Sequence, residues 1–242
     1  MSVFMTNAIE KCEVIHMKHV AIITGGYLDL EFAKTYLKTL SYDKVFAVDK
    51  GLEYVDALGL IPTCLVGDFD TVNQDMLSDY EMKIAQGEIS SMLERYPAMK
   101  DATDTEIAVD MAIKMGAKSI TLFAATGSRL DHLLANLGLL LTAARQHVNL
   151  QIVDAHNRVR ILSDEDMKKC VIKKDEQFGK YVSLVPITPI VEGVTLKGAL
   201  YPLESAIIYQ GESRTVSNEI LEECIQIQLE KGAMLVLESK DN

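Results

Sequence analysis

Acidic residues form short motifs at the ends of apolar runs and at the start of a helical segment. Asp49 ends one run, Gly67-Asp68-Phe69-Asp70 ends the next, and Asp101-Ala102-Thr103-Asp104 opens a segment with helical periodicity. Residues two apart in an extended segment face the same way, so Asp68 and Asp70 are expected to converge on one point. Converging carboxylates repel one another unless a cation neutralises them. Oxygen ligands of this kind suit Mg²⁺, which usually binds one or two carboxylates together with substrate phosphates.

Each acidic residue also has a structural interpretation. Aspartate is common in the turn after a strand, which would account for Asp68 alone. Thr103 and Glu106 have the spacing of a helix capping box, and a carboxylate at Asp104 would favour the positive end of that helix. The placement of all these residues at strand ends favours the functional interpretation, because ligands of open α/β sheets bind there.

A glycine turn with a cation precedes a long apolar helix. The segment Thr126-Gly127-Ser128-Arg129 leads into a helix expected over Leu130–Gln146, whose free N–H groups and dipole would favour a phosphate. Arg129 adds a fork of donors that matches phosphate geometry. The sequence leaves three roles open for Asp131: orienting Arg129, binding a metal or a substrate amine, and capping the helix. For His132 it leaves two: hydrogen bonding within the helix and a direct role in the chemistry.

Composition excludes several classes of protein. The 242 residues include 24 Lys and Arg against 35 Asp and Glu, a formal charge of −11, which argues against binding to nucleic acid or to an anionic membrane. The N-terminus has no secretory signal pattern and no apolar stretch is long enough to span a bilayer. The four cysteines are widely spaced without a CxxC pair, so we expect a cytoplasmic protein.

The first part of the chain alternates apolar runs with helical segments. Strands are expected at the ranges His19–Thr24, Lys44–Val48, Thr63–Val66, Ser119–Ala124 and Leu150–Val153. Helices are expected between them, at Leu28–Leu40, Leu52–Leu58, Asp104–Met115 and Leu130–Gln146. Apolar strands separated by helices predict a parallel sheet covered on both faces, a three-layer α/β domain.

The pattern changes after about Asp166. Short runs punctuated by Gly, Pro and Ser predict a smaller all-β sandwich, in which Cys224–Leu229 turns through Glu230-Lys231-Gly232 into Ala233–Leu237 as a hairpin. The predicted organisation is therefore an α/β domain over residues 18–165 and a β-sandwich domain over residues 166–242. Residues 1–17 are interpreted as a loose leader or an alternative start.

The ordered set of motifs resembles the thiamine pyrophosphokinase family. In the first part the resemblance rests on Val48-Asp49-Lys50-Gly51, Gly67-Asp68-Phe69-Asp70, Lys100-Asp101-Ala102-Thr103-Asp104 and Gly127-Ser128-Arg129-Leu130-Asp131-His132. In the second part it rests on Ser183-Leu184-Val185-Pro186, Gly198-Ala199-Leu200-Tyr201-Pro202-Leu203 and Val216-Ser217-Asn218-Glu219. The match runs from about Lys18 to the C-terminus.

The resemblance implies transfer of pyrophosphate from ATP to the hydroxyl of thiamine, giving AMP and thiamine diphosphate. It implies Mg²⁺ and a homodimer with the thiamine site at the interface. Its implied metal ligands are Asp49, Asp68, Asp70 and Asp104, and its catalytic residues are Asp68, Asp70, Asp104, Arg129 and Asp131. The implied nucleotide site consists of Asp49, Gly67, Thr126, Gly127, Ser128, Arg129 and His132, and the implied thiamine contacts are Ser217, Asn218 and Tyr201.

Two departures from the family pattern bear on these assignments. The chain has no Trp, and Tyr201 stands where some relatives have one; Ala102 interrupts the third motif, which puts Asp101 in more doubt than Asp104. Two other hypotheses compete with the first: a pyrophosphokinase of another small alcohol, and a thiamine- or nucleotide-binding module without activity. Retention of the whole acidic set together with Arg129 argues against the binding module.

Overall fold

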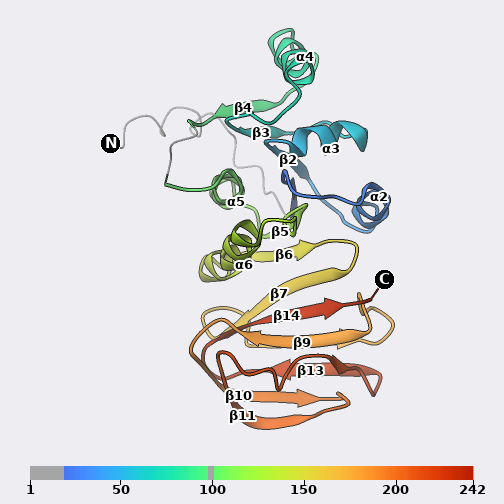
Figure 1. The fold of residues 1–242 in the computed structure, drawn as a ribbon, viewed down its shortest axis with the longest axis vertical. Helices are drawn as coiled ribbons and strands as arrows, with labels where there is room; N and C mark the ends of the chain where they lie inside the picture. Colours follow the sequence, from blue (N-terminus) through green and yellow to red (C-terminus); the bar gives the residue numbers. More distant parts are fainter. Residues whose placement is uncertain (1–18, 98–100, 242) are drawn as a thin grey trace.

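The computed structural model of the protein describes residues 19–97 and 101–241. The leader expected over residues 1–17 and Lys100 of the third acidic motif lie outside the described residues. Helices gather around one end of an elongated molecule, and the other end consists of β-strands (Figure 1). Within the described residues, no helix is both long enough and apolar enough to cross a membrane.

Six parallel strands form the first part of the chain. They are β1 (His19–Ile23), β2 (Lys44–Val48), β3 (Cys64–Gly67), β4 (Met92–Arg95), β5 (Ser119–Phe123) and β6 (Asn149–Val153). Their order in space is β6-β5-β1-β2-β3-β4. The inner strands are buried on both faces, which explains why they are apolar throughout.

Helices cover both faces of this sheet (Figure 1). They are α2 (Leu30–Leu37), α3 (Gly51–Ala57), α4 (Gln74–Ala85), α5 (Asp104–Lys114) and α6 (Leu130–Arg145). Side chains of α2, α3 and α4 share one buried core with the sheet, and side chains of α5 and α6 share another on the opposite face. Three of the helices begin at side-chain caps from Asp29, Asn73 and Thr103.

The same sheet continues into the second part of the chain. The second part contributes β7 (Asn157–Ser163), β8 (Lys169–Lys173), β9 (Tyr181–Pro186), β10 (Ile190–Lys197), β11 (Leu203–Tyr209), β12 (Asn218–Glu219), β13 (Cys224–Gln228) and β14 (Ala233–Ser239). Strands β7, β14, β9 and β12 extend the parallel sheet from β6 in antiparallel fashion to give ten strands, and β11, β10, β13 and β8 form a second sheet. The predicted fold class, a three-layer α/β part followed by a β-sandwich, is confirmed.

Strand β14 contributes to two cores. Met234 and Val236 face the core between the two sheets, whereas Leu235 and Leu237 face the core beneath α5 and α6. This alternation follows from the two-residue period of a strand. The ten-stranded sheet thus crosses the boundary predicted at residues 165 and 166, and the division of the chain into domains stays a prediction.

The predicted hairpin between Cys224–Leu229 and Ala233–Leu237 is wrong. Strand β13 pairs with β10 and β8, whereas β14 pairs with β7 and β9 in the other sheet. Lys231 forms a bridge with Glu192 of β10 instead. Apolar residues alternate with others in both segments because each strand has one face on the sandwich core. The two strands belong to different sheets, so the turn between them connects the sheets.

Five elements were not predicted from the sequence, one of them the two-residue strand β12. Helix α4 has a weakly apolar face, β4 is a short strand at the edge of the sheet, and β8 carries lysines at both ends. Strand β7 contains Arg158 and Arg160, which broke the apolar pattern. The two arginines are compatible with a sheet interior because a buried carboxylate lies opposite them.

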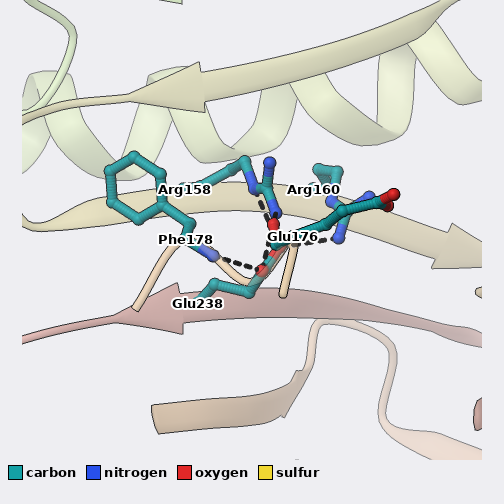
Figure 2. Close-up of polar contacts among 5 residues, drawn as sticks. All are labelled: Arg158, Arg160, Glu176, Phe178 and Glu238. Carbon is teal, nitrogen blue, oxygen red and sulfur yellow. Dashed lines mark hydrogen bonds and ion pairs between the residues drawn. The ribbon is translucent and has the colours of Figure 1, made fainter. Parts of the chain in front are cut away.

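That carboxylate is Glu238 of β14, which has no exposed surface (Figure 2). Arg158 donates to it through Nε (2.8 Å) and Nη2 (2.7 Å), Arg160 donates through Nη2 (2.7 Å), and the backbone N–H of Phe178 donates at 3.0 Å. Burial alone would raise the pKa of Glu238, but the bonds and charges of these partners outweigh it and lower the pKa. The carboxylate is therefore ionised and binds both arginines.

Phe178 links this ion cluster to helix α2. The Arg158 guanidinium lies 5.7 Å from the Phe178 ring centroid. The same ring makes edge contacts with Phe32 and Tyr36 of α2, at centroid distances of 6.0 Å and 6.1 Å. The cluster therefore connects β7 and β14 to a helix of the α/β part.

We expect Glu238→Gln to lower the free energy of unfolding at pH 7 by about 3–5 kcal/mol, because two partly buried arginines lose their fully buried counter-charge. Glu176→Gln is the matched control, since its carboxylate is 64% exposed and pairs with Lys173 at the surface, and it should cost about 0–1 kcal/mol. The lowered pKa of Glu238 makes its contribution complete above the unfolded value of about 4.3 and lost as the pH falls through the folded value. Denaturant unfolding at pH 7 and at pH 3 measures both effects; a constant difference between the variant and the wild type would contradict the assignment.

Candidate functional site

The strand order places a topological switch point at the carboxyl ends of β1 and β5, the position of the ligand crevice in open α/β sheets. The chain leaves β1 toward β2 on one side, whereas β5 lies on the other side of β1. Such a switch point in the strand order is where open α/β sheets bind ligands. The segment Thr126–Arg129 lies here, after β5, as the sequence predicted.

Two glycines bring the crevice loops into contact. A Cβ on Gly26 would lie 2.2 Å from the carbonyl oxygen of Ala124, and one on Gly127 would lie 3.2 Å from the Cα of Gly26. The hydroxyl of Thr24 donates to the Ala124 carbonyl at 2.7 Å. Backbone therefore forms this part of the crevice, because a side chain at Gly26 would overlap the Ala124 carbonyl and one at Gly127 would fit only tightly.

Asp49 supports the loop after β3. Its Oδ1 accepts from the backbone N–H of Phe69 at 3.4 Å, and a Cβ on Gly67 would lie 1.8 Å from the same oxygen. Gly67 has φ of 151°. The carboxylate of Asp49 thus lies directly against the backbone of the Gly67–Asp70 motif.

Asp68 and Asp70 do converge, but through a turn and not through an extended segment. The backbone N–H of Asp70 donates to Oδ1 of Asp68 at 3.1 Å, and Phe69 between them has φ of 60°. An aspartate side chain that bonds two residues ahead replaces strand geometry with a local turn. The negative charge of Asp68, with a smaller contribution from Asp104, raises the pKa of Asp70.

The donor set fits a hard divalent ion held together with a substrate. In residues 19–97 and 101–241, no group of three or more His, Cys, Asp or Glu side chains is arranged to hold a metal by itself. Two mutually repelling carboxylates, Asp68 and Asp70, are nevertheless the number that Mg²⁺ usually takes when phosphate oxygens complete its shell. Asp104, in the first turn of α5, lies close enough to contribute to the raised pKa of Asp70.

Arg129 and Asp131 form an ion pair at the start of α6. Nε of Arg129 lies 3.2 Å from Oδ1 of Asp131, and Nη2 lies 2.6 Å from Oδ2. This bond is the main reason that the pKa of Asp131 falls to about 2. Of the interpretations left open by the sequence, the geometry matches an aspartate that orients the guanidinium.

The neighbouring residues line the same helix start. Thr126 and Gly127 are half-buried, and Ser128 and His132 are exposed. The backbone N–H of His132 donates to Oδ1 of Asp131 at 2.9 Å, and the described contacts give no role to its ring. Asn136 of α6 donates to the Ala125 carbonyl at 2.9 Å and so fixes the helix against the loop.

The three residues predicted to contact thiamine lie far from the acidic pair. Asn218 is in β12, at the edge of the ten-stranded sheet, with Ser217 beside it and Tyr201 bonded to it. Eight inter-strand steps separate β12 from β3, which at about 4.8 Å each is roughly 38 Å along the sheet. The structure therefore gathers the first-part residues around one crevice and does not bring the second-part residues to it within one chain.

Arg95 belongs to the surroundings of the acidic pair and was missed by the sequence analysis. It ends β4, where it pairs in register with Gly67, and its guanidinium lies 5.3 Å from the ring centroid of Phe69. It also forms an ion pair with Glu81 of α4 at 2.5 Å. The short run Met92–Arg95 between Gly87 and Pro97 was the available signal.

The fold and site define a two-part class, in which a doubly wound α/β unit with acidic residues at its strand ends is joined to a β-sandwich. The sequence model for "Thiamin pyrophosphokinase, catalytic domain" matches residues 36–152, and that for "Thiamin pyrophosphokinase, vitamin B1 binding domain" matches residues 169–234. The chain belongs to the thiamin pyrophosphokinase family.

Individual relatives agree with this assignment. Thiamine pyrophosphokinase of Bacillus subtilis (strain 168) is 29% identical over 225 residues, covering 93% of this chain and 100% of the relative. The crystal structure of the Bacillus subtilis protein superposes with a TM-score of 0.80 at 26% identity, over 93% of this chain and 100% of that one. The Geobacillus thermodenitrificans structure gives a TM-score of 0.74 at 29% identity, over 93% and 98%. The Candida albicans enzyme, at 14% identity, shares the fold with a TM-score of 0.72, over 93% and 90%.

Gly26→Ala is expected to lower the free energy of unfolding by about 1–3 kcal/mol, because the added methyl group overlaps the Ala124 carbonyl. Gly138→Ala is the matched control on α6, where an added Cβ meets nothing within 4 Å. It should stabilise the protein by about 0.5–1 kcal/mol through helix propensity. Thermal unfolding of both variants checks the close approach, and equal stabilities would argue against it.

Proposed function

We propose that this protein is a thiamine pyrophosphokinase, which transfers the terminal pyrophosphoryl group of ATP to the hydroxyl of thiamine and releases AMP and thiamine diphosphate. The observation that carries the proposal is the presence of both matched domains of this family in one chain, in the order catalytic and then vitamin B1 binding. The acidic pair at the end of β3 supplies the chemistry that such a transfer needs.

The crevice between β1 and β5 is the proposed nucleotide site. Its backbone lining around Gly26 and Gly127, with the N-terminus of α6, favours a polyphosphate. Arg129 offers a paired guanidinium that can exchange its bond to Asp131 for one to a phosphate. These groups bind and orient ATP on a protein whose net charge of −11 would otherwise repel it.

Asp68 and Asp70, with Asp104 nearby, are the proposed holders of Mg²⁺. An ion held there would supply positive charge that offsets the negative charge developing during transfer. Asp49 shapes the loop that presents the pair through its bond to Phe69.

The residues would act mainly by positioning. The thiamine hydroxyl oxygen forms a bond to Pβ as the bond between Pβ and the oxygen bridging it to Pα breaks. AMP leaves with that oxygen, and the hydroxyl proton is released. Because the attacking and leaving oxygens must be in line, the crevice residues hold the triphosphate while a second surface holds thiamine.

That second surface is proposed to come from another copy of the chain. Tyr201 and Ser217 belong to the vitamin B1 binding part, roughly 38 Å along the sheet from Asp68 by strand spacing. A homodimer in which β12 of one subunit approaches the crevice of its partner would unite the two sets. A cytoplasmic location, expected from the sequence, stays a prediction.

Asp68→Asn is expected to lower the rate of AMP formation from ATP, Mg²⁺ and thiamine by roughly 100-fold or more, because it removes one of two carboxylates at the reacting phosphates. Asp79→Asn makes the same charge change on an exposed carboxylate of α4 and should leave the rate unchanged. Chromatographic measurement of AMP and thiamine diphosphate is the assay. Near-normal turnover by the Asp68 variant would remove the acidic pair from the mechanism, and turnover with other alcohols but not thiamine would favour a related enzyme.

Mixing Asp68→Asn with Tyr201→Ala tests whether the site is shared between subunits. If each site takes Asp68 from one subunit and Tyr201 from the other, random exchange gives half heterodimers with one intact site each, and about a quarter of wild-type activity returns. The assay uses thiamine well below its KM and subunits co-expressed with two different affinity tags. Activity no greater than the sum of the separate variants would contradict a shared site.

A further inference from the structure

Two segments of the second part are held together by a short backbone ladder. The N–H of Leu221 donates to the Gly198 carbonyl at 2.9 Å, and the N–H of Leu200 donates to the Glu219 carbonyl at 2.9 Å. Ala199 and Ile220 form an antiparallel bridge between these bonds. The next residue along this ladder is Tyr201, which is 64% exposed.

The backbone ladder stops before Tyr201. Ser217 has φ of 58°, and its N–H donates to the hydroxyl of Ser183 at 2.9 Å, so the chain turns away toward β9. Pro202, which follows Tyr201, has no N–H to offer. Both backbone groups of Tyr201 therefore need a partner other than a continuing strand.

The side chain of Asn218 supplies that partner. Its Oδ1 accepts from the N–H of Tyr201 at 3.0 Å and from the N–H of Glu219 at 2.9 Å, and its Nδ2 donates to the carbonyl of Tyr201 at 2.8 Å. The amide thus makes with Tyr201 the donor and acceptor pair that a neighbouring strand residue would make. One side chain replaces one step of the ladder.

Little of Asn218 is left for a ligand. Both acceptor positions of Oδ1 and one of the two N–H groups are used within the chain, and the residue is only 4% exposed. Its backbone is fixed as well, because Asn218 pairs with Val182 of β9. A rigid connection therefore runs from the edge of the ten-stranded sheet through Asn218 to Tyr201.

The two segments that carry Tyr201 and Asn218 also contain other exposed apolar residues. Leu200, Val216 and Leu221 from the same two segments are 42%, 45% and 61% exposed. An exposed phenol ring on a backbone held by Asn218 suits a flat aromatic or a cationic ring, both of which thiamine has.

We propose that Asn218 is a positioning residue that fixes the Tyr201 ring for thiamine binding and does not itself contact thiamine. This inference rests on the proposed function and changes the role that the family resemblance implied for Asn218. Tyr201 contacts the substrate, and Asn218 acts through Tyr201.

A double-mutant cycle on KM for thiamine tests the inference. We expect Tyr201→Ala to raise this KM by about 10-fold, as the loss of a ring contact would, and Asn218→Ala to raise it by a similar factor or less. The double variant should be no worse than Tyr201→Ala alone, since Asn218 has nothing to position once the ring is gone. KM for ATP should stay unchanged in all three, and Tyr201→Phe should retain the wild-type KM for thiamine.

Thr215→Val is the matched control for loss of a buried polar contact in the same segment. Its hydroxyl donates to the Leu184 carbonyl at 2.6 Å and does not contact Tyr201. It should lower the melting temperature without changing KM for thiamine, which separates positioning from general destabilisation. If Asn218→Ala does not fold, Asn218→Asp serves, because it keeps the acceptor oxygen and replaces the amide that donates to the Tyr201 carbonyl with a charged oxygen that cannot donate.

The outcomes distinguish this inference from the proposed function. Factors that multiply in the double variant, or a KM for thiamine that either single substitution leaves unchanged, would overturn the positioning role while wild-type turnover stands. Wild-type protein that forms no thiamine diphosphate would overturn the proposed function itself. Factors that fail to multiply, with KM for ATP constant, support Asn218 as a positioning residue.

Discussion

The backbone pairing between β6 and β7 is the constraint on which the two-part structure depends. Strand β6 closes the parallel series, and β7 reverses direction beside it, with Val153 paired to Arg158. From this point the sheet continues through β14 and β9 to β12 without interruption (Figure 1). The two parts therefore share one hydrogen-bonded framework, reinforced by Glu238 and its two arginines. Motion of one part as a rigid body relative to the other would require strand pairs to separate.

The acidic pair illustrates a conflict between stability and chemistry. Asp68 and Asp70 repel each other, as the raised pKa of Asp70 records, and the turn through Phe69 nevertheless holds them together. Asp49 maintains that turn through backbone contacts with Phe69 and Gly67. The cation proposed for this place would relieve the repulsion and so stabilise the folded protein.

The sequence predicted the α/β part more completely than the β part. Apolar runs ending in Asp49 or in Gly67-Asp68 located β2 and β3 to within a residue, because buried parallel strands have a distinct pattern. Strand β7 was missed because Arg158 and Arg160 are compatible with burial only opposite Glu238, a partner about 80 residues away. The role of Asn218 was likewise beyond sequence reasoning, since its bonds to Tyr201 depend on the turn at Ser217. Pairings between distant segments, and not local preferences, account for what the sequence did not reveal.

The place of β14 between β7 and β9 has a consequence for how the protein is made. Residues 233–239 are synthesised after every other strand described, yet they fill the gap at the centre of the antiparallel region and serve two cores at once. On a ribosome the helical half can collapse early, whereas β7 and β9 must wait with open edges until this last strand emerges. Nascent chains stalled before residue 233 would thus expose two unpaired strand edges that can pair with other chains. The interval before β14 emerges is when a chaperone would matter most to this fold.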